Sequence, residues 1–134
     1  MTGGKQRILI IDDEPSFTRL LKAVLEERGA YDVAQESVGT KGIDAVRAFQ
    51  PDLILLDVVM PGISGKEIAA QLAADAELRH IPVVFLTASV PKDTPGARSP
   101  TIDGRPFLAK PVGHEELIAC VERHIRRDAA GQPR

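Results

Sequence analysis

Hydrophobic residues in this chain alternate between two patterns. Short apolar runs rich in β-branched residues predict strands, and apolar spacings of three and four predict the buried faces of helices. The runs cover residues 7–11, 31–37, 53–57, 81–89 and 105–111. Helical spacing follows the first, second and last of these runs, and a helix-start signal follows the third. This alternation of strands and helices predicts an open, doubly wound α/β fold.

Residues typical of helix ends mark where the predicted helices begin and stop. Pro15 suits the first turn of the first helix, and Gly29 suits its C-terminal end. Ser64, with Glu67 three residues later, matches a capping box and predicts the start of the third helix. The first helix is expected to bury one apolar stripe, which consists of Phe17, Leu20, Leu21, Val24 and Leu25.

Polar residues stand where four of the five predicted strands end. The run at residues 53–57 is apolar up to its last residue, which indicates a strand covered on both faces, as in a parallel sheet. In such sheets ligands bind beyond the carboxyl ends of the strands. The polar residues at those ends are Asp12, Asp13, Asp57, Thr87 and Lys110. Their convergence predicts one shared site.

The chemistry of this set points to phosphoryl groups. Two carboxylates about 4 Å apart repel each other by roughly 4 kcal/mol at an effective dielectric constant of about 20, so the acids need a counter-charge. Mg²⁺ is the usual partner of such oxygen clusters. Thr87 offers a hydroxyl donor and Lys110 a positive charge, as stabilisation of a phosphoryl group in transfer requires. Asp57 stands apart from the acidic pair and is therefore the candidate nucleophile.

Plainer interpretations exist for each residue alone. A strand-end aspartate is often the N-cap of the next helix, and for Asp13 alone that alternative stays open. A single Thr or Lys at a strand end is usually incidental. The joint pattern at four strand ends is what favours a functional site.

The segments "IIDDEP", "DLILLDVVMPGISG", "VVFLTA" and "FLAKP" together resemble the receiver domain of bacterial two-component response regulators. The resemblance covers about residues 6–127, which we take as the domain, with polar, flexible ends at residues 1–5 and 128–134. It implies a flavodoxin-like five-stranded parallel sheet with strand order 2-1-3-4-5.

The resemblance also implies a role for each acid. Asp12 and Asp13, with Asp57 and the backbone carbonyl of Val59, would hold Mg²⁺. Asp57 would accept a phosphoryl group from the phosphohistidine of a histidine kinase or histidine phosphotransfer protein.

The resemblance implies further roles for residues on the last two strands. Thr87 and Lys110 would bind the phosphoryl oxygens. Thr87 and Phe107 match the pair that switches on phosphorylation. The Lys110–Pro111 peptide matches one that the family holds in the cis form.

One stretch departs from the family pattern. Receivers usually place a fourth amphipathic helix before the last strand, but residues 90–105 hold three prolines and two glycines and lack apolar periodicity. Proline and glycine are unfavourable inside helices. We therefore expect the fourth helix to be missing or replaced by a loop.

Charge and composition limit the partners and the location. The net charge of −2 shows no electrostatic footprint for nucleic acid. No apolar run is long enough to span a bilayer, and the single cysteine excludes an internal disulfide. We expect a cytoplasmic protein that binds neither nucleic acid nor membrane. No effector domain is recognisable after residue 127, so a stand-alone receiver is expected.

Three functions fit the residues. The first is a phosphorylated signalling module that acts by contact with an unknown downstream protein, with no enzymatic activity beyond its own phosphorylation and dephosphorylation. The second is a phosphatase with an aspartyl nucleophile, although "DDEP" lacks the D-x-D pattern of such enzymes. The third is a scaffold receiver that is never phosphorylated.

Overall fold

A computed structural model describes residues 5–88 and 101–125 of the chain. These residues form a parallel sheet with strand order β2-β1-β3-β4-β5, which confirms the predicted fold class. The strands are β1 (Gln6–Ile11), β2 (Tyr31–Glu36), β3 (Leu53–Asp57), β4 (Val83–Thr87) and β5 (Phe107–Ala109). The helices are α1 (Pro15–Glu27), α2 (Gly42–Phe49), α3 (Gly65–Ala74) and α4 (His114–His124), and a short 3-10 helix, η1 (Gly39–Lys41), precedes α2.

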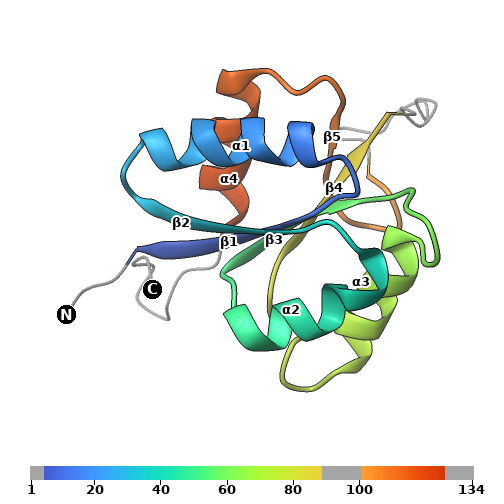
Figure 1. The fold of residues 1–134 in the computed structure, drawn as a ribbon. Coiled ribbons are helices and arrows are strands. Elements are labelled where there is room, and N and C mark those ends of the chain that lie inside the picture. Colours follow the sequence, from blue (N-terminus) through green and yellow to red (C-terminus); the bar gives the residue numbers. More distant parts are fainter. Residues whose placement is uncertain (1–4, 89–100, 126–134) are drawn as a thin grey trace, which may run out of the picture.

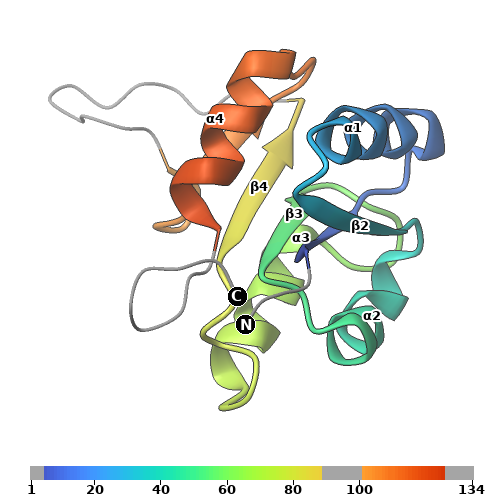
Figure 2. The same cartoon turned by 90° about the vertical axis from the view of Figure 1, so that its left-hand side faces the viewer.

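Helices cover both faces of the sheet. Helices α1 and α4 lie on one face, and α2 and α3 lie on the other (Figure 1, Figure 2). Successive residues of a strand point to opposite faces, so Ile8 and Ile10 of β1 join one hydrophobic cluster while Leu9 and Ile11 join the other. All five residues of β3 are buried, as the continuous apolar run predicted. The core therefore consists of two layers separated by the sheet.

Helix α1 begins as the sequence predicts, and four residues of its predicted apolar stripe pack on the core, namely Phe17, Leu21, Val24 and Leu25. Pro15 occupies the first turn. Leu20 is 52% exposed, so its place in the predicted apolar stripe is wrong. Consecutive helical residues are about 100° apart, which turns Leu20 away from the sheet when Leu21 faces it. Thr18 is buried instead, and its hydroxyl donates to the carbonyl of Pro15.

The connection between β4 and β5 is only partly described. Residues 101–106 form a tight turn in which Ile102 and Arg105 exchange backbone hydrogen bonds. Asp103 and Gly104 take positive φ angles at its tip. This part of the connection agrees with the predicted loop and contains no helix. The rest of that prediction, at residues 90–100, and the predicted flexible ends at residues 1–4 and 128–134 lie outside the described residues.

No helix in the two described ranges is both long enough and apolar enough to cross a membrane.

Candidate functional site

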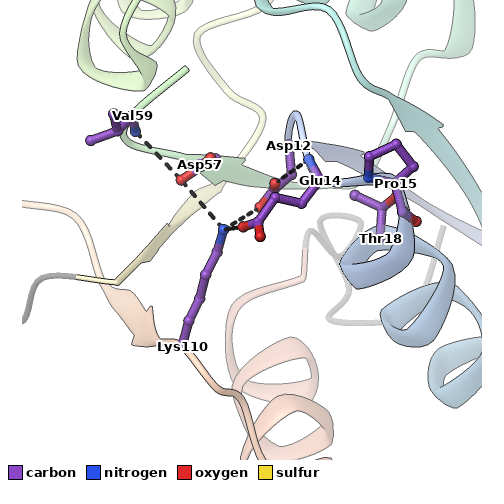
Figure 3. Close-up of polar contacts among 7 residues, drawn as sticks. All are labelled: Asp12, Glu14, Pro15, Thr18, Asp57, Val59 and Lys110. Carbon is purple, nitrogen blue, oxygen red and sulfur yellow. Dashed lines mark hydrogen bonds and ion pairs between the residues drawn. The ribbon is translucent and has the colours of Figure 1, made fainter. Parts of the chain in front are cut away.

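The carboxyl ends of the strands form the candidate site. Parallel pairing aligns Ile11 of β1 with Leu56 of β3, so the next residues, Asp12 and Asp57, emerge side by side. Likewise, β4 and β5 pair with Thr87 opposite Ala109, which places Lys110 beside the end of β4. The register of the sheet therefore gathers the polar strand ends, as the sequence predicts. Figure 3 shows three of them, Asp12, Asp57 and Lys110, close together.

Three acids in this site lie close enough to share a cation. Asp12, Asp13 and Asp57 each offer a carboxylate oxygen within 4.8 Å of the others. Asp12 is fully buried, and Asp57 is 5% exposed. Asp13 precedes Glu14, which is the N-cap residue of α1, so the alternative of Asp13 as a helix cap is wrong. The three acids therefore form one cluster at the site.

Burial and charge perturb Asp57. Burial raises the pKa of its carboxyl group to about 6, and the negative charge of Asp12 adds to that rise, while Lys110 opposes it. The backbone N–H of Val59 donates to Asp57 Oδ1 across 3.4 Å, a long hydrogen bond. The Nζ of Lys110 lies 3.7 Å from the same oxygen. Asp57 is thus a buried carboxylate with little direct stabilisation.

Asp12 has one oxygen with a hydrogen bond and one without. Its Oδ1 accepts from the backbone N–H of Glu14 at 3.0 Å. Its Oδ2 lies 2.8 Å from Lys110 Nζ, but the orientation is that of an ion pair, and this buried oxygen has no well-directed hydrogen bond within the described residues. Burial raises the pKa of Asp12, against the effect of Lys110. An incompletely satisfied carboxylate in a cluster of three fits a hard divalent cation such as Mg²⁺.

The remaining predicted residues line the same cleft or flank it. A cleft of about 260 Å³ is lined by Asp57, Thr87 and Lys110 together with Asp13, Glu14, Val59 and Ala88. The side chain of Val59 is 76% exposed. Phe107 is half-buried and packs on the α2–α3 side of the sheet, where it pairs with Phe85. The Lys110–Pro111 peptide bond is cis, which confirms that prediction.

Elsewhere in the part of the chain that the structure describes lie two larger grooves. One of about 350 Å³ lies between α1 and α4, and another of about 460 Å³ lies between α4 and β5. Neither contains the acidic cluster. The chemistry of the lining residues, rather than the size of the groove, identifies the candidate site.

The start of α3 packs unusually closely on the end of β3. A Cβ atom added at Gly65 would lie 2.1 Å from the backbone oxygen of Asp57. The Gly65 N–H donates to the carbonyl of Val58 at 2.8 Å. Glycine therefore lets the start of α3 pack directly on the backbone of the candidate acceptor residue. The predicted capping box of Ser64 and Glu67 forms at the same helix end.

Two neighbours of Lys110 are not predicted by the sequence. Glu14 Oε1 lies 2.8 Å from Lys110 Nζ, and the ring of Phe17 has its centroid 4.6 Å from the same nitrogen. The sequence pattern around each residue indicates a different role and does not point to a contact with Lys110. Glu14 belongs to the "DDEP" segment, and helical spacing assigns Phe17 to the apolar stripe of α1.

Known proteins match this chain in sequence and in fold. The family model for the response regulator receiver domain matches residues 8–122. PilH of Pseudomonas aeruginosa is 36% identical over 115 residues, which cover 86% of this chain and 93% of PilH. The DNA-binding response regulator MtrA of Mycolicibacterium smegmatis is 38% identical over 128 residues, which cover 92% of this chain and 52% of MtrA. The chain thus spans about half the length of the MtrA proteins it matches.

Solved structures show the same fold. The chemotaxis response regulator CheY4 of Vibrio cholerae superposes with a TM-score of 0.74 at 21% identity, over 90% of this chain and 98% of CheY4. The chain belongs to the response regulator receiver domain family of two-component signalling.

Proposed function

We propose that this chain is a phosphorylated receiver in which Asp57 accepts the phosphoryl group. The observation that carries the proposal is a poorly stabilised buried carboxylate, Asp57, that shares a cleft with Thr87 and Lys110 and forms a cluster with two further acids. The donor would be the phosphohistidine of a sensor histidine kinase or a histidine phosphotransfer protein, as the family implies. The family consists of signalling domains, so the reaction would be stoichiometric transfer rather than turnover of a substrate.

Each residue of the site would have its own role in the phosphoryl transfer. A carboxylate oxygen of Asp57 attacks phosphorus, the bond from phosphorus to the histidine nitrogen breaks, and the imidazole leaves with that electron pair. The Thr87 hydroxyl and Lys110 ammonium group would donate hydrogen bonds to the phosphoryl oxygens. Asp12, Asp13, Asp57 and the carbonyl of Val59 would hold Mg²⁺. The ion, when bound, supplies positive charge that offsets the repulsion between the acids and the incoming phosphate.

Output by contact with a downstream protein is implied by the same family. Relatives differ in this respect, because MtrA is named a DNA-binding regulator, whereas PilH has nearly the length of this chain. The net charge of −2 supports a protein target over nucleic acid or a membrane surface. The switch pair Thr87 and Phe107 and a cytoplasmic location remain predictions.

A labelling experiment tests the proposal. The purified chain is incubated with Mg²⁺ and a small acyl phosphate, and the phosphorylated fraction is measured by intact mass. We expect labelling of the native chain, loss of labelling with EDTA, and loss in Asp57→Asn. Asp52→Asn is the matched control, because Asp52 is also a buried aspartate beside β3, and it should label normally.

Other results would favour the alternatives. Labelling of Asp57→Asn at the native rate would exclude Asp57 as the acceptor. Continuous release of phosphate from p-nitrophenyl phosphate would indicate a phosphatase. A native chain that neither labels nor binds Mg²⁺ would indicate an unphosphorylated scaffold.

A further inference from the structure

Lys110 has an unusual set of neighbours. Its Nζ lies 2.8 Å from Asp12 Oδ2, 2.8 Å from Glu14 Oε1 and 3.7 Å from Asp57 Oδ1. The aromatic face of Phe17 lies at 4.6 Å. Two of these neighbours, Asp12 and Asp57, belong to the candidate metal cluster. The other two, Glu14 and Phe17, come from the start of α1 and lie outside that cluster.

Glu14 occupies a position that usually has a different task. It is the N-cap residue of α1, where short polar side chains normally accept a hydrogen bond from the first turn. Its side chain makes no such bond. It extends instead to Lys110 while remaining 59% exposed. Glutamate here stabilises the lysine and not the helix.

Phe17 completes the contact one helical turn further on. Its ring is half-buried against the α1–α4 side of the core, which fixes its position. An ammonium group over an aromatic face is attracted by the negative electrostatic potential of the ring. The start of α1 therefore offers Lys110 one carboxylate and one aromatic face, neither of which belongs to the acidic cluster.

We propose that Glu14 and Phe17 are positioning residues that hold the Lys110 ammonium group on the α1 side of the cleft, clear of the Asp57 carboxylate. This inference rests on the proposed role of Asp57 as phosphoacceptor. A lysine paired directly with Asp57 would cover the attacking oxygen and reduce its nucleophilicity. At 3.7 Å from Asp57 Oδ1, the Lys110 Nζ is beyond hydrogen-bonding distance of that oxygen and is still near enough to meet an arriving phosphoryl group.

The arrangement also lets Lys110 leave Asp12 without losing all of its partners. A cation in the acidic cluster would compete with Lys110 for Asp12 Oδ2, because both are positive and that oxygen is buried. Glu14 and Phe17 do not belong to the cluster and remain available to Lys110. We therefore expect Mg²⁺ to bind more weakly when either contact is removed.

A spectroscopic test addresses the position of Lys110 in the metal-free, unphosphorylated protein. Protons above an aromatic ring shift upfield, so the Lys110 ε-methylene resonance reports contact with Phe17. We expect an upfield shift in the native chain and a reduced one in Glu14→Gln, which removes the charge, and in Glu14→Asp, which shortens the reach. Phe17 is intact in both variants. Glu36→Gln, which removes a carboxylate at the end of β2, is the matched control and should keep the shift.

A functional test uses variants that do not change the charge. Phe17→Leu removes the aromatic face and Phe17→Tyr keeps it. We expect Phe17→Leu and Glu14→Asp to label with acyl phosphate more slowly, by roughly three- to tenfold, as small misplacements of reacting groups do. Their Mg²⁺ dissociation constants, measured calorimetrically with the metal alone, should rise. Phe17→Tyr should restore both properties.

The outcomes separate this inference from the proposed function. An unchanged Lys110 shift in both Glu14 variants would overturn the positioning role, whether or not Asp57 is phosphorylated. A shift retained in Glu14→Asp but lost in Glu14→Gln would show that the carboxylate charge, and not the reach of the side chain, places Lys110, and it would overturn the role of the direct contact. A native chain that shows the upfield shift but never labels would overturn the proposed function and leave the contact itself established.

Discussion

Two buried aspartates flank the same strand and lie in opposite surroundings. Asp52 precedes β3 and Asp57 ends it, and each is 5% exposed. Asp52 Oδ2 accepts from the backbone N–H of Arg7 at 2.9 Å, and its own N–H donates to the Arg7 carbonyl at 2.7 Å. Asp57 has one long backbone hydrogen bond and another carboxylate beside it. Burial alone does not distinguish a structural aspartate from a functional one.

The difference lies in what surrounds each carboxylate. A buried polar group is tolerated when it is hydrogen-bonded, and Asp52 meets that condition by joining β1 to the start of β3. At Asp57, burial and the nearby Asp12 act against the charged form. The aspartate at the amino end of β3 therefore stabilises the fold by linking two strands. The carboxyl end gathers negative charge that Lys110 offsets only in part, and an added cation would offset more of it.

Removing the charge of Asp57 should give the largest effect on stability. A pKa raised from 3.8 to about 6 means that the folded protein binds more protons than the unfolded chain between these values. The free energy of unfolding should therefore fall as pH rises from about 4 to 6, by up to about 3 kcal/mol. Asp57→Asn should lack this fall and exceed the native stability at pH 7 in metal-free buffer. Urea unfolding at several pH values measures both.

Mg²⁺ provides the internal check on that prediction. Saturating Mg²⁺ at pH 7 should stabilise the native chain, because it binds the folded state, and should narrow its difference from Asp57→Asn. A difference in unfolding free energy between the metal-free native chain and Asp57→Asn that stays constant from pH 4 to 6 would contradict the raised pKa of Asp57.

Gly65→Ala tests how closely the acceptor is packed. The added Cβ would lie 2.1 Å from the Asp57 backbone oxygen, and backbone cannot move aside cheaply. Overpacking of this kind costs about 1–3 kcal/mol, and we expect the upper half of that range together with slower labelling of Asp57. Gly113→Ala is the control, because its nearest neighbour is 3.9 Å away, and it should cost under about 1 kcal/mol. Equal stability of the two variants would show that α3 is free to shift.

Asp52→Ala tests the structural role of the other aspartate, and it should lower stability without affecting phosphorylation. The Arg7 N–H loses its carboxylate acceptor, and an unsatisfied buried donor costs about 1–3 kcal/mol. We expect a loss of about 1–2 kcal/mol in urea unfolding, with labelling of Asp57 retained. Asp52→Asn keeps an acceptor oxygen and should lose less. A labelling defect in the Ala variant without a loss of stability would give Asp52 a role in the site.

Pattern and register made most of this molecule predictable from its sequence. Apolar runs predicted the strands, and a parallel sheet with polar strand ends predicted the convergence of Asp12, Asp57, Thr87 and Lys110. The strand order came from the family resemblance. Helical periodicity does not fix the edges of a wide apolar stripe. It therefore placed Leu20 of α1 in the core, whereas the structure buries Thr18 and exposes Leu20.

Contacts between residues that are far apart in the chain leave no local pattern in the sequence, so they could not be predicted from it. The pairing of Lys110 with Glu14 joins residues 96 positions apart. The clash at Gly65 depends on how closely α3 approaches the end of β3. A capping residue predicts a helix start, but it does not show whether its side chain caps the helix or extends elsewhere, as Glu14 does.

The smallest expected effect concerns Val59, whose side chain lines the cleft beside Asp57 and is 76% exposed. Loss of phosphate from Asp57 requires a water molecule in line with the phosphorus–oxygen bond, and an aliphatic side chain cannot hydrogen-bond that water. Val59→Asn supplies an amide at the same place and should shorten the lifetime of the phosphorylated chain a few-fold. Unfolding free energy should change by less than about 0.5 kcal/mol, because the side chain is exposed.

Val59→Leu is the matched control, since it keeps the apolar character and adds bulk. Lifetimes are measured by intact mass after the phosphodonor is removed. An unchanged or longer lifetime in Val59→Asn would mean that this position does not contact the attacking water. A shorter lifetime in both variants would indicate that disturbance of the Val59 N–H bond to Asp57 Oδ1, and not water binding, controls the loss. Faster loss in Val59→Asn alone would show that a hydrogen-bonding side chain at this position places the attacking water and that the native valine prolongs the phosphorylated state.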